Sequence, residues 1–416
     1  MLARIIQFFK RTRAIRPFWL KRRRKIRAAA KHLKPGLYLA CDEQFFVWRL
    51  WTARLPGHLV EARIRNGIDG NGGISETVRL CRLWVKHTFA IGAGLLMVRS
   101  GGGFSVAVVS RDGTLILLDA ESGSVKRLAE RPIYTTEYIA LRSALASHIP
   151  CPVFAVDEDG AAIAEEFVQG EIYETLGKSD KRAATRVLLQ GFAELVANQG
   201  VWHSEEMLTR MRAAFAAREL PETLRIESWF ARTLKRSRHW PLVPAHGDLH
   251  SENIVVRQGD TVLIDLAGID KPLGLCLSMR PFWYDAITLI VSPAVPDLFQ
   301  EFLEGHFDDE FTNLYARAGC DFDPGEVIDT LRTWVLLRAF EKREQLGFEA
   351  EDRLVHIALQ LWDDIYARLL RSGGPGLVRS ITHGKDKPSL AYFKVAEAGP
   401  QCVKQRKSAS SGPVRG

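Results

Sequence analysis

Two nearby segments of the sequence carry side chains with oxygen atoms suited to metal binding and proton transfer. Residues 244–256 read PAHGDLHSENIVV, which includes Asp248 and Asn253. Asp265 follows in the stretch VLID. Carboxylate and amide oxygens suit Mg²⁺, which binds such groups together with water and substrate phosphates. A further carboxylate that stays off the metal can orient a hydroxyl group for attack. These residue types together favour phosphoryl transfer.

A β-hairpin is the element that would bring these three residues together. The apolar runs 254–256 and 262–264 flank a turn at Gly259 and Asp260. Gly and Asp between two apolar runs are typical of hairpin turns. The three polar residues would then lie at one edge of the hairpin, where the first strand begins and the second strand ends.

The surrounding sequence is β-rich in its first half and helical in its second half. Short apolar runs within 95–128 alternate with glycine-containing turns, and residues 135–148 have the apolar spacing of a helix. After Gly170 the apolar spacing is mostly helical, as in 182–198 and 327–342. This order predicts an α+β fold with two lobes.

The motif HGDLHSEN, followed by a hydrophobic strand that ends in Asp, resembles the signatures of the aminoglycoside phosphotransferase and choline kinase-like family. These proteins are relatives of protein kinases and phosphorylate small molecules. The resemblance implies a protein-kinase-like fold with a small β-rich N-lobe and a larger helical C-lobe. It implies that Asp248 is the catalytic base and that Asn253 and Asp265 bind Mg²⁺. His246 would support the loop through hydrogen bonds. Asp285, in the stretch MRPFWYDAI, is similar to a family residue that caps a helix and braces the catalytic loop.

A kinase-like nucleotide site also needs a strand Lys that binds phosphates and a helical Glu that orients it. Lys126, in the strand-like run SVKRL, precedes the predicted helix, and Glu137 lies on that helix. The resemblance therefore implies that Lys126 and Glu137 pair at the phosphates. Arg127 is expected on the opposite face of the strand, as the weaker choice. The alternative interpretation of Lys126 is a solvated surface residue.

Two further stretches are similar to nucleotide-binding parts of the family. If the SVKRL run is the third strand of the N-lobe, the loop that covers the phosphates is 110–113 and includes Gly113. The glycine run 101–103 then lies outside the site as a β-turn. The stretch AEEFVQG resembles the hinge between the lobes. There the backbone around Glu166 and Val168 would hydrogen-bond an adenine or guanine edge.

These assignments predict a Mg²⁺-dependent enzyme that transfers the γ-phosphate of ATP or GTP to a hydroxyl group of a small molecule. Acidic residues of the helical half, Glu341 among them, are candidates for attracting a cationic acceptor. A solvated helix face is the simpler explanation of these acids. The alternative function is a non-catalytic nucleotide-binding or scaffold protein with a kinase-like fold at a membrane surface.

The charge of the chain is unevenly distributed. The sequence has 416 residues and a formal net charge of +8, but residues 1–41 contain 13 Lys and Arg and no acidic residue. Residues 378–416 contain eight basic and two acidic residues, which leaves residues 42–377 with a net charge of −11. A nucleic-acid footprint needs clustered Lys and Arg on the binding domain itself. The acidic body therefore argues against nucleic acid as a partner and leaves only the basic ends for it.

The basic N-terminal arm, residues 1–36, has two interpretations. Leu2, Ile5, Ile6 and Phe9 fall on one helical face, and many Lys and Arg residues surround and follow them. This pattern is typical of an amphipathic helix on an anionic membrane. The alternative is a solvated basic arm. The six cysteines form no CxxC pair, and six in 416 residues are too few for a disulfide scaffold, which indicates a reducing compartment. We therefore expect a cytoplasmic protein, held at the inner face of the membrane under the first interpretation.

Composition divides the chain into five segments. They are a basic amphipathic arm 1–36, an unassigned N-terminal region 37–93, a β-rich nucleotide-binding N-lobe 94–169, a helical catalytic C-lobe 170–377 and a basic, disordered tail 378–416.

Overall fold

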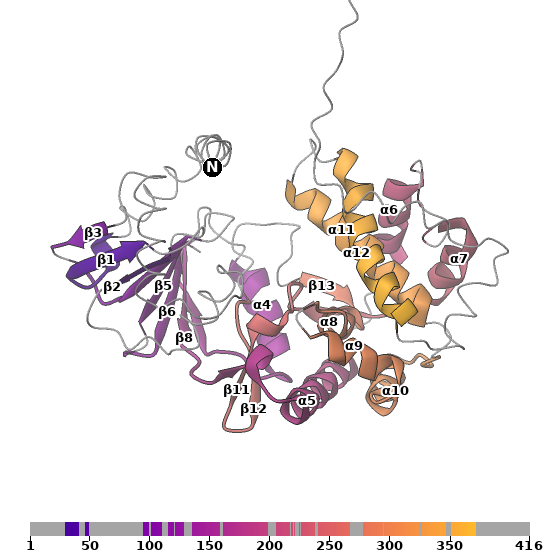
Figure 1. The fold of residues 1–416 in the computed structure, drawn as a ribbon, viewed down its shortest axis with the longest axis horizontal. Coiled ribbons are helices and arrows are strands. Elements are labelled where there is room, and N and C mark those ends of the chain that lie inside the picture. The colour runs from indigo at the N-terminus through magenta and orange to yellow at the C-terminus, as the bar shows by residue number, and fades with distance from the viewer. Residues whose placement is uncertain are drawn as a thin grey trace, which may run out of the picture. The chain divides into compact units, whose positions relative to one another are not determined.

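Figure 1 shows the fold of the protein in a computed structural model, whose chain is divided into two units. The units are Met1–Ser372 and Gly373–Gly416, and every described residue lies in the first. The structure describes residues 30–40, 46–49, 95–99, 101–109, 115–119, 121–128, 135–158, 161–198, 205–216, 218, 220, 224, 226–237, 240–266, 278–293, 295–323, 327–346 and 351–371.

Eight strands form one antiparallel sheet in the order β3–β1–β2–β4–β5–β6–β8–β7. The strands are β1 Gly36–Ala40, β2 Phe46–Arg49, β3 Leu95–Val98, β4 Val106–Val109, β5 Leu115–Asp119, β6 Ser124–Leu128, β7 Phe154–Val156 and β8 Ala162–Glu166. Burial alternates along them, as in β6, where Val125 and Arg127 are buried and Lys126 is partly exposed. Successive strand residues point to opposite faces of the sheet, so Lys126 and Arg127 cannot serve the same face.

Strands β1–β3 widen the sheet beyond β4, and the chain before β1 docks beside them. The Lys34 N–H donates to the Phe104 carbonyl at 2.8 Å, and the Phe104 N–H donates to the His32 carbonyl at 3.1 Å. A Cβ atom on Gly101 would lie 1.9 Å from the carbonyl oxygen of Leu33. The glycine run that was predicted to form a simple turn therefore permits a close approach between two backbone segments.

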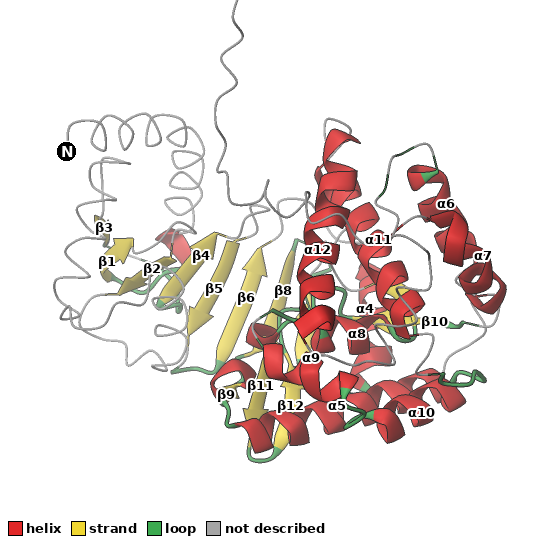
Figure 2. Cartoon of the chain, turned by 45° about the vertical axis from the view of Figure 1, so that its right-hand side comes forward, coloured by secondary structure: helices red, strands yellow, loops and turns green. Residues whose placement is uncertain are grey.

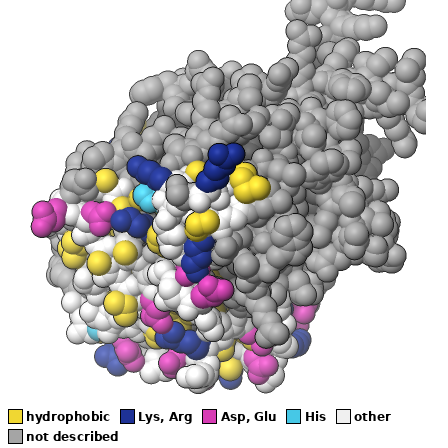
Figure 3. All heavy atoms as spheres, turned by 90° about the vertical axis from the view of Figure 1, so that its left-hand side faces the viewer, with side chains coloured by type: hydrophobic (Ala, Val, Ile, Leu, Met, Phe, Trp, Pro, Cys, Tyr) yellow, Lys and Arg dark blue, Asp and Glu magenta, His cyan; other side chains and the backbone are white. Residues whose placement is uncertain are grey.

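Side chains of both charges meet on this part of the molecule. The Lys34 ammonium lies 3.0 Å from the Asp119 carboxylate and 2.7 Å from that of Glu121. In the view of Figure 3, the described basic, acidic and hydrophobic side chains are intermixed. The docked segment is thus held by ion pairs as well as by backbone hydrogen bonds.

One helix, α4 (Thr135–Ala146), packs against the far end of the sheet. The Tyr138 ring meets the Phe154 ring of β7 edge-on, with 6.1 Å between centroids. Arg142 is fully buried and donates to the Pro152 carbonyl at 3.1 Å. The helix therefore brings a buried cation to the sheet.

After residue 170, the described part of the chain contains five short strands and eight α-helices. Strands β12, β11 and β9 form one small sheet in that order, and β10 pairs with β13. These elements are β9 Glu171–Ile172, β10 Leu242–Ala245, β11 Ile254–Arg257, β12 Asp260–Leu263, β13 Ser278–Pro281, α5 Lys178–Ala197, α6 Glu205–Phe215, α7 Ile226–Ser237, α8 Tyr284–Ile290, α9 Pro296–Leu303, α10 Asp308–Arg317, α11 Val327–Leu346 and α12 Glu351–Arg371. Their core includes the fully buried Trp229, Trp283 and Trp362. Figure 2 shows the strands in yellow and the helices in red.

Several predictions concern residues outside the described ranges. They include the amphipathic helix of the basic arm, the phosphate-covering loop with Gly113, and the basic tail. The five segment boundaries likewise stay predictions. Within the described part of the chain, no helix is both long enough and apolar enough to cross a membrane.

Candidate active site

The loop between β10 and β11, residues 246–253, is shaped by a buried carboxylate. Gly247 takes a φ of +76°, which suits glycine and turns the chain. The Asp285 carboxylate accepts the N–H of His246 at 2.6 Å and the N–H of Gly247 at 3.2 Å. Asp285 lies in the first turn of α8, but Trp283 occupies the cap position. Its carboxylate faces the loop, so its contacts are with the loop backbone rather than with the helix end.

The His246 ring ties this loop to the end of β12. Its Nε2 lies 2.8 Å from the Ile264 carbonyl oxygen, and its Nδ1 lies 3.3 Å from the Asp248 nitrogen, whose N–H it accepts. A carbonyl oxygen only accepts, so Nε2 carries the proton in this arrangement. The imidazole thus links the loop to the strand that precedes Asp265, as a structural contact.

Asn253 joins the same two segments. Its Nδ2 donates to the Asp248 carbonyl at 3.0 Å and lies 3.1 Å from His250 Nε2. Its backbone carbonyl accepts the N–H of Ile264 at 2.9 Å. Because the amide nitrogen faces protein acceptors, Oδ1 is the atom that a cation can approach. The antiparallel register of the hairpin pairs Ile254 with Leu263, so Asn253 lies opposite Ile264, the residue before Asp265.

Asp265 itself adopts an unusual backbone conformation. Its φ is +62°, in the left-handed region that costs a non-glycine residue about 1–2 kcal/mol. Such strain is characteristic of functional sites. The Asp265 side chain is about half exposed, and its Oδ1 lies 2.6 Å from Arg127.

The oxygen atoms of Asn253 and Asp265 are of the type that a hard divalent cation binds. Asn253 Oδ1 and the Asp265 carboxylate are the groups that can hold it. Among the described residues, no cluster of three or more His, Cys, Asp or Glu side chains could hold a metal by itself. Two protein ligands with waters and phosphates are the arrangement that Mg²⁺ prefers in nucleotide sites.

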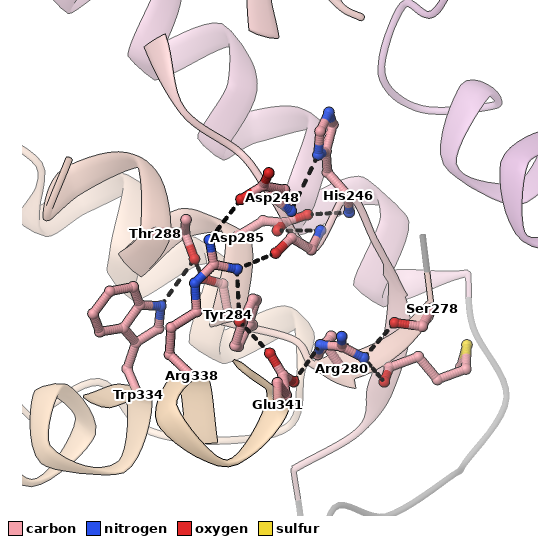
Figure 4. Close-up of polar contacts among 12 residues, drawn as sticks. His246, Asp248, Ser278, Arg280, Tyr284, Asp285, Thr288, Trp334, Arg338 and Glu341 are labelled. Carbon is pink, nitrogen blue, oxygen red and sulfur yellow. Dashed lines mark hydrogen bonds and ion pairs between the residues drawn. The ribbon is translucent and has the colours of Figure 1, made fainter. Parts of the chain in front are cut away.

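The Asp248 side chain is held by an arginine that the sequence pattern did not reveal (Figure 4). Arg338, on α11, donates from NH2 to Asp248 Oδ1 at 2.6 Å and from NH1 to the Gly247 carbonyl. Burial alone would raise the pKa of Asp248, but the charge of Arg338 outweighs it and holds that pKa below its usual range. With 42% of its side chain exposed, Asp248 can still reach solvent. The carboxylate is therefore ionised at neutral pH and accessible.

Arg338 is backed by further buried polar groups. Its NH1 lies 3.3 Å from the Tyr284 hydroxyl, which donates to Glu341 Oε2 at 2.7 Å. Glu341 Oε1 in turn lies 2.6 Å from Arg280. Glu341 was considered as a surface acid that attracts a cationic acceptor. That interpretation is wrong, because the side chain is buried and is paired inside the C-lobe.

The residues predicted to bind the nucleotide are arranged differently from the prediction. Lys126 pairs with Asp157, 3.4 Å away, and Glu137 is exposed on α4, so the structure does not bring the two together. Arg127, on the opposite face of β6, reaches Asp265 and also contacts Glu165 Oε2 at 2.6 Å. The reason is the strand register: one position along β6 changes the face on which a side chain lies.

Glu165 is the centre of this buried ion cluster. Its second oxygen accepts from Arg142 of α4. Burial would raise the pKa of Glu165, but Arg127 and Arg142 outweigh it and hold the pKa below its ordinary value. Glu165 on the sheet therefore pairs with the cation of β6. This role was predicted for Glu137 on the helix.

The residues predicted to form the hinge lie against the β11–β12 hairpin. The Glu166 N–H donates to the Val153 carbonyl and the Phe167 N–H to the Gly123 carbonyl, at 2.9 and 2.8 Å. These two donors therefore do not face a nucleotide base. Val168 packs against Val255 and Val262 of the hairpin. A Cβ on Gly170 would lie 2.5 Å from Val255 Cγ1, so glycine permits this contact.

A comparison with known families decides the relationship of the chain. The sequence matches the model of the phosphotransferase enzyme family over residues 98–322, more than half of its length. The chain belongs to this family. The matched span covers β4 to α10 and contains the catalytic loop, both candidate metal ligands and Arg127, while Arg338 lies beyond it. Family membership and the observed β-rich and helical parts confirm the predicted two-lobed, protein-kinase-like α+β fold.

Solved structures with detectable similarity to this phosphotransferase-family chain come from several bacteria. An aminoglycoside phosphotransferase, APH(3'')-Id from Streptomyces rimosus, is 17% identical, with a TM-score of 0.36, and the match covers 56% of this chain and 92% of that one. A macrolide 2'-phosphotransferase from Brachybacterium faecium is 19% identical, with a TM-score of 0.39 and coverages of 62% and 89%. A choline/ethanolamine kinase family protein from Mesorhizobium loti is 16% identical, with a TM-score of 0.33 and coverages of 65% and 90%. No curated protein matches the sequence. Because these TM-scores are low, the assignment of the chain to the family rests on the sequence match over residues 98–322.

Proposed function

We propose that the protein transfers the γ-phosphate of ATP or GTP to a hydroxyl group of a small molecule, with Mg²⁺ as the metal. One observation carries this proposal. Hydrogen bonds join Asn253 to the backbone of Asp248 and to Ile264, the residue before Asp265, and the Asp248 carboxylate is accessible. This division between one carboxylate for the acceptor and two oxygen ligands for the metal is what phosphoryl transfer requires.

In the proposed reaction, Asp248 orients the acceptor hydroxyl and takes its proton. The hydroxyl oxygen forms a bond to the γ-phosphorus while the bond from that phosphorus to the bridging oxygen breaks, and the nucleoside diphosphate leaves. The lowered pKa of Asp248 makes orientation the larger part of its role, because a weak base gains little proton before the transition state.

The remaining residues bind the nucleotide. Asn253 and Asp265 hold Mg²⁺, which when bound offsets the charge of the transferring phosphoryl group. Arg127 replaces Lys126 as the cation that contacts phosphates, because it reaches the Asp265 edge and Lys126 does not. Backbone groups around Val168 contact the base edge, and the loop with Gly113 covers the phosphates.

The experiment is a phosphate-transfer screen with γ-labelled ATP and GTP against aminoglycosides, amino alcohols and sugars. We expect transfer to at least one acceptor by the wild type, and a loss of about a thousandfold in Asp248→Asn. Asp260→Asn, which changes an exposed Asp in the same hairpin, should retain the wild-type rate. Equal rates for Asp248→Asn and wild type would overturn the assignment. No transfer by the wild type, with no thermal stabilisation by Mg²⁺ and nucleotide, would favour the non-catalytic scaffold.

A further inference from the structure

Arg338 makes a two-point contact with the catalytic loop. Its NH2 donates to Asp248 Oδ1 at 2.6 Å, and its NH1 donates to the carbonyl of the preceding residue, Gly247. Figure 4 shows the guanidinium between Asp248 and the buried Tyr284. One end of the arginine therefore fixes both the backbone and the side chain of the loop at consecutive residues.

The Arg338 guanidinium is also held in place by buried polar side chains. Tyr284 is fully buried, and its hydroxyl oxygen accepts a hydrogen bond from Arg338 NH1 at 3.3 Å. The same hydroxyl donates a hydrogen bond to Glu341 Oε2 at 2.7 Å. Glu341 is fixed by Arg280, 2.6 Å away. Only 10% of the Arg338 side chain is exposed. A side chain locked by packing and by partners in this way can define the position of a catalytic group.

The two carboxylate oxygens of Asp248 have different surroundings as a result. Oδ1 is engaged by the guanidinium, whereas the side chain as a whole keeps 42% exposure. An exposed Asp rotates among several side-chain conformers when nothing restrains it. The contact with Arg338 restrains the carboxylate through Oδ1.

We propose that Arg338 is a positioning residue for phosphoryl transfer. It engages Asp248 Oδ1 and the Gly247 carbonyl, so that Oδ2 is presented to the acceptor hydroxyl in one orientation. This inference rests on the proposed function and assigns a role to a residue of α11 that lies outside the family match.

The same helix provides a matched control. Arg332 is also largely buried, and its NH1 pairs with Asp329 at 3.0 Å, one helical turn away. Its cation–π contacts are with Trp229 and Trp362. Arg332→Met thus removes a buried cation from α11 at a distance from the catalytic loop.

The first measurement is crystallographic and needs no acceptor. Full-length wild type, Arg338→Lys, Arg338→Met and Arg332→Met are compared for the conformation of the Asp248 side chain. We expect a single conformer in the wild type, Arg338→Lys and Arg332→Met, and rotation or disorder of the carboxylate in Arg338→Met. A wild-type conformer in Arg338→Met would overturn the proposal. Thermal melts identify any variant that fails to fold, and Arg338→Lys then provides the comparison.

The second measurement is kinetic and uses streptomycin, glucosamine and choline as acceptor probes with Mg²⁺ and ATP or GTP. Misplacement of a reacting group by about 1 Å costs on the order of a hundredfold in rate. We therefore expect Arg338→Met to lower kcat about a hundredfold, with the KM for nucleotide unchanged. Arg338→Lys should recover much of that loss, and Arg332→Met should keep the wild-type kcat.

The outcomes separate the two proposals. A wild type that transfers phosphate, with Arg338→Met equally fast, would refute the positioning role and leave the proposed function standing. A wild type that transfers no phosphate to the three probes would count against the proposed function for those acceptors. In that case the crystallographic comparison still decides whether Arg338 positions Asp248.

Discussion

The two sides of the active site are held in different ways. In the catalytic loop, backbone groups make most of the contacts: the N–H groups of His246 and Gly247 bind Asp285, and the Asn253 carbonyl binds β12. On the proposed nucleotide side, charged side chains meet at the sheet, with Glu165 between the buried Arg127 and Arg142. A backbone-held site keeps its shape when one functional side chain changes. A site held by ions depends on every charge in the cluster.

Of the substitutions that test this contrast, Glu165→Gln should have the largest effect on stability. At neutral pH we expect a loss of about 3–5 kcal/mol in the free energy of unfolding, because Arg127 and Arg142 lose a buried charge partner. The pKa of Glu165 is lowered in the folded state, so its contribution is present above the ordinary Glu value of 4.5 and fades as pH falls through the lowered pKa. Urea unfolding at several pH values measures the difference between the two proteins.

Glu137→Gln is the control for this experiment, since Glu137 is exposed on the neighbouring helix. Its effect should stay within about 0.5 kcal/mol at any pH. If the difference between wild type and Glu165→Gln failed to shrink below pH 4.5, the ion cluster would not be the source of the stability.

Asp285→Asn tests the backbone-held side. The new amide has one acceptor oxygen, so its NH2 must oppose the N–H of either His246 or Gly247. We expect a loss of about 2 kcal/mol in unfolding free energy, together with a lower transfer rate, because the loop shifts. Chemical denaturation and the transfer assay measure both.

Asp309→Asn controls for the charge of the helix itself. Asp309 is also an acid in the first turn of a helix, but it is exposed. Its loss should cost only about 0.3–1 kcal/mol, from the interaction with the helix dipole. An equal loss in the two variants would mean that Asp285 acts through α8 rather than through the loop.

The smallest expected effect is on nucleotide affinity, and it distinguishes Arg127 from the adjacent Lys126. Arg127→Met should weaken nucleotide binding about tenfold, measured by calorimetry with Mg²⁺ and ATP or GTP. Lys126→Met should leave the affinity unchanged, because this ammonium pairs with Asp157 on the other face. The reverse order of effects would restore Lys126 as the phosphate-binding residue.

The catalytic loop could be predicted from sequence because its parts are close in the chain. Asp248 and Asn253 are five residues apart and hydrogen-bonded, and the hairpin turn sets the position of Asp265. A contiguous motif therefore specifies most of the local geometry. The fold class followed from the same motif and from the order of strand-like and helical runs.

The choice between Lys126 and Arg127 could not be made from sequence. It depends on which face of β6 turns toward the hairpin, and a shift of one residue reverses the answer. Arg338 was missed for a similar reason, since it lies 90 residues after Asp248 and only the packing of α11 brings it to the loop. Gly101 shows the same limit, because its neighbour Leu33 is distant in the chain.

The placement of an arginine on the inner face of β6 has a consequence for chemical labelling. Reagents that carry an acyl group on a nucleotide phosphate modify a primary amine beside the bound phosphates. Burial lowers the pKa of Arg127, but the carboxylates of Glu165 and Asp265 more than compensate and raise it above the ordinary value, so the guanidinium stays protonated and unreactive. The amine of Lys126 points to the other face. Neither Arg127 nor Lys126 is therefore expected to react with an amine-directed nucleotide probe at the proposed site.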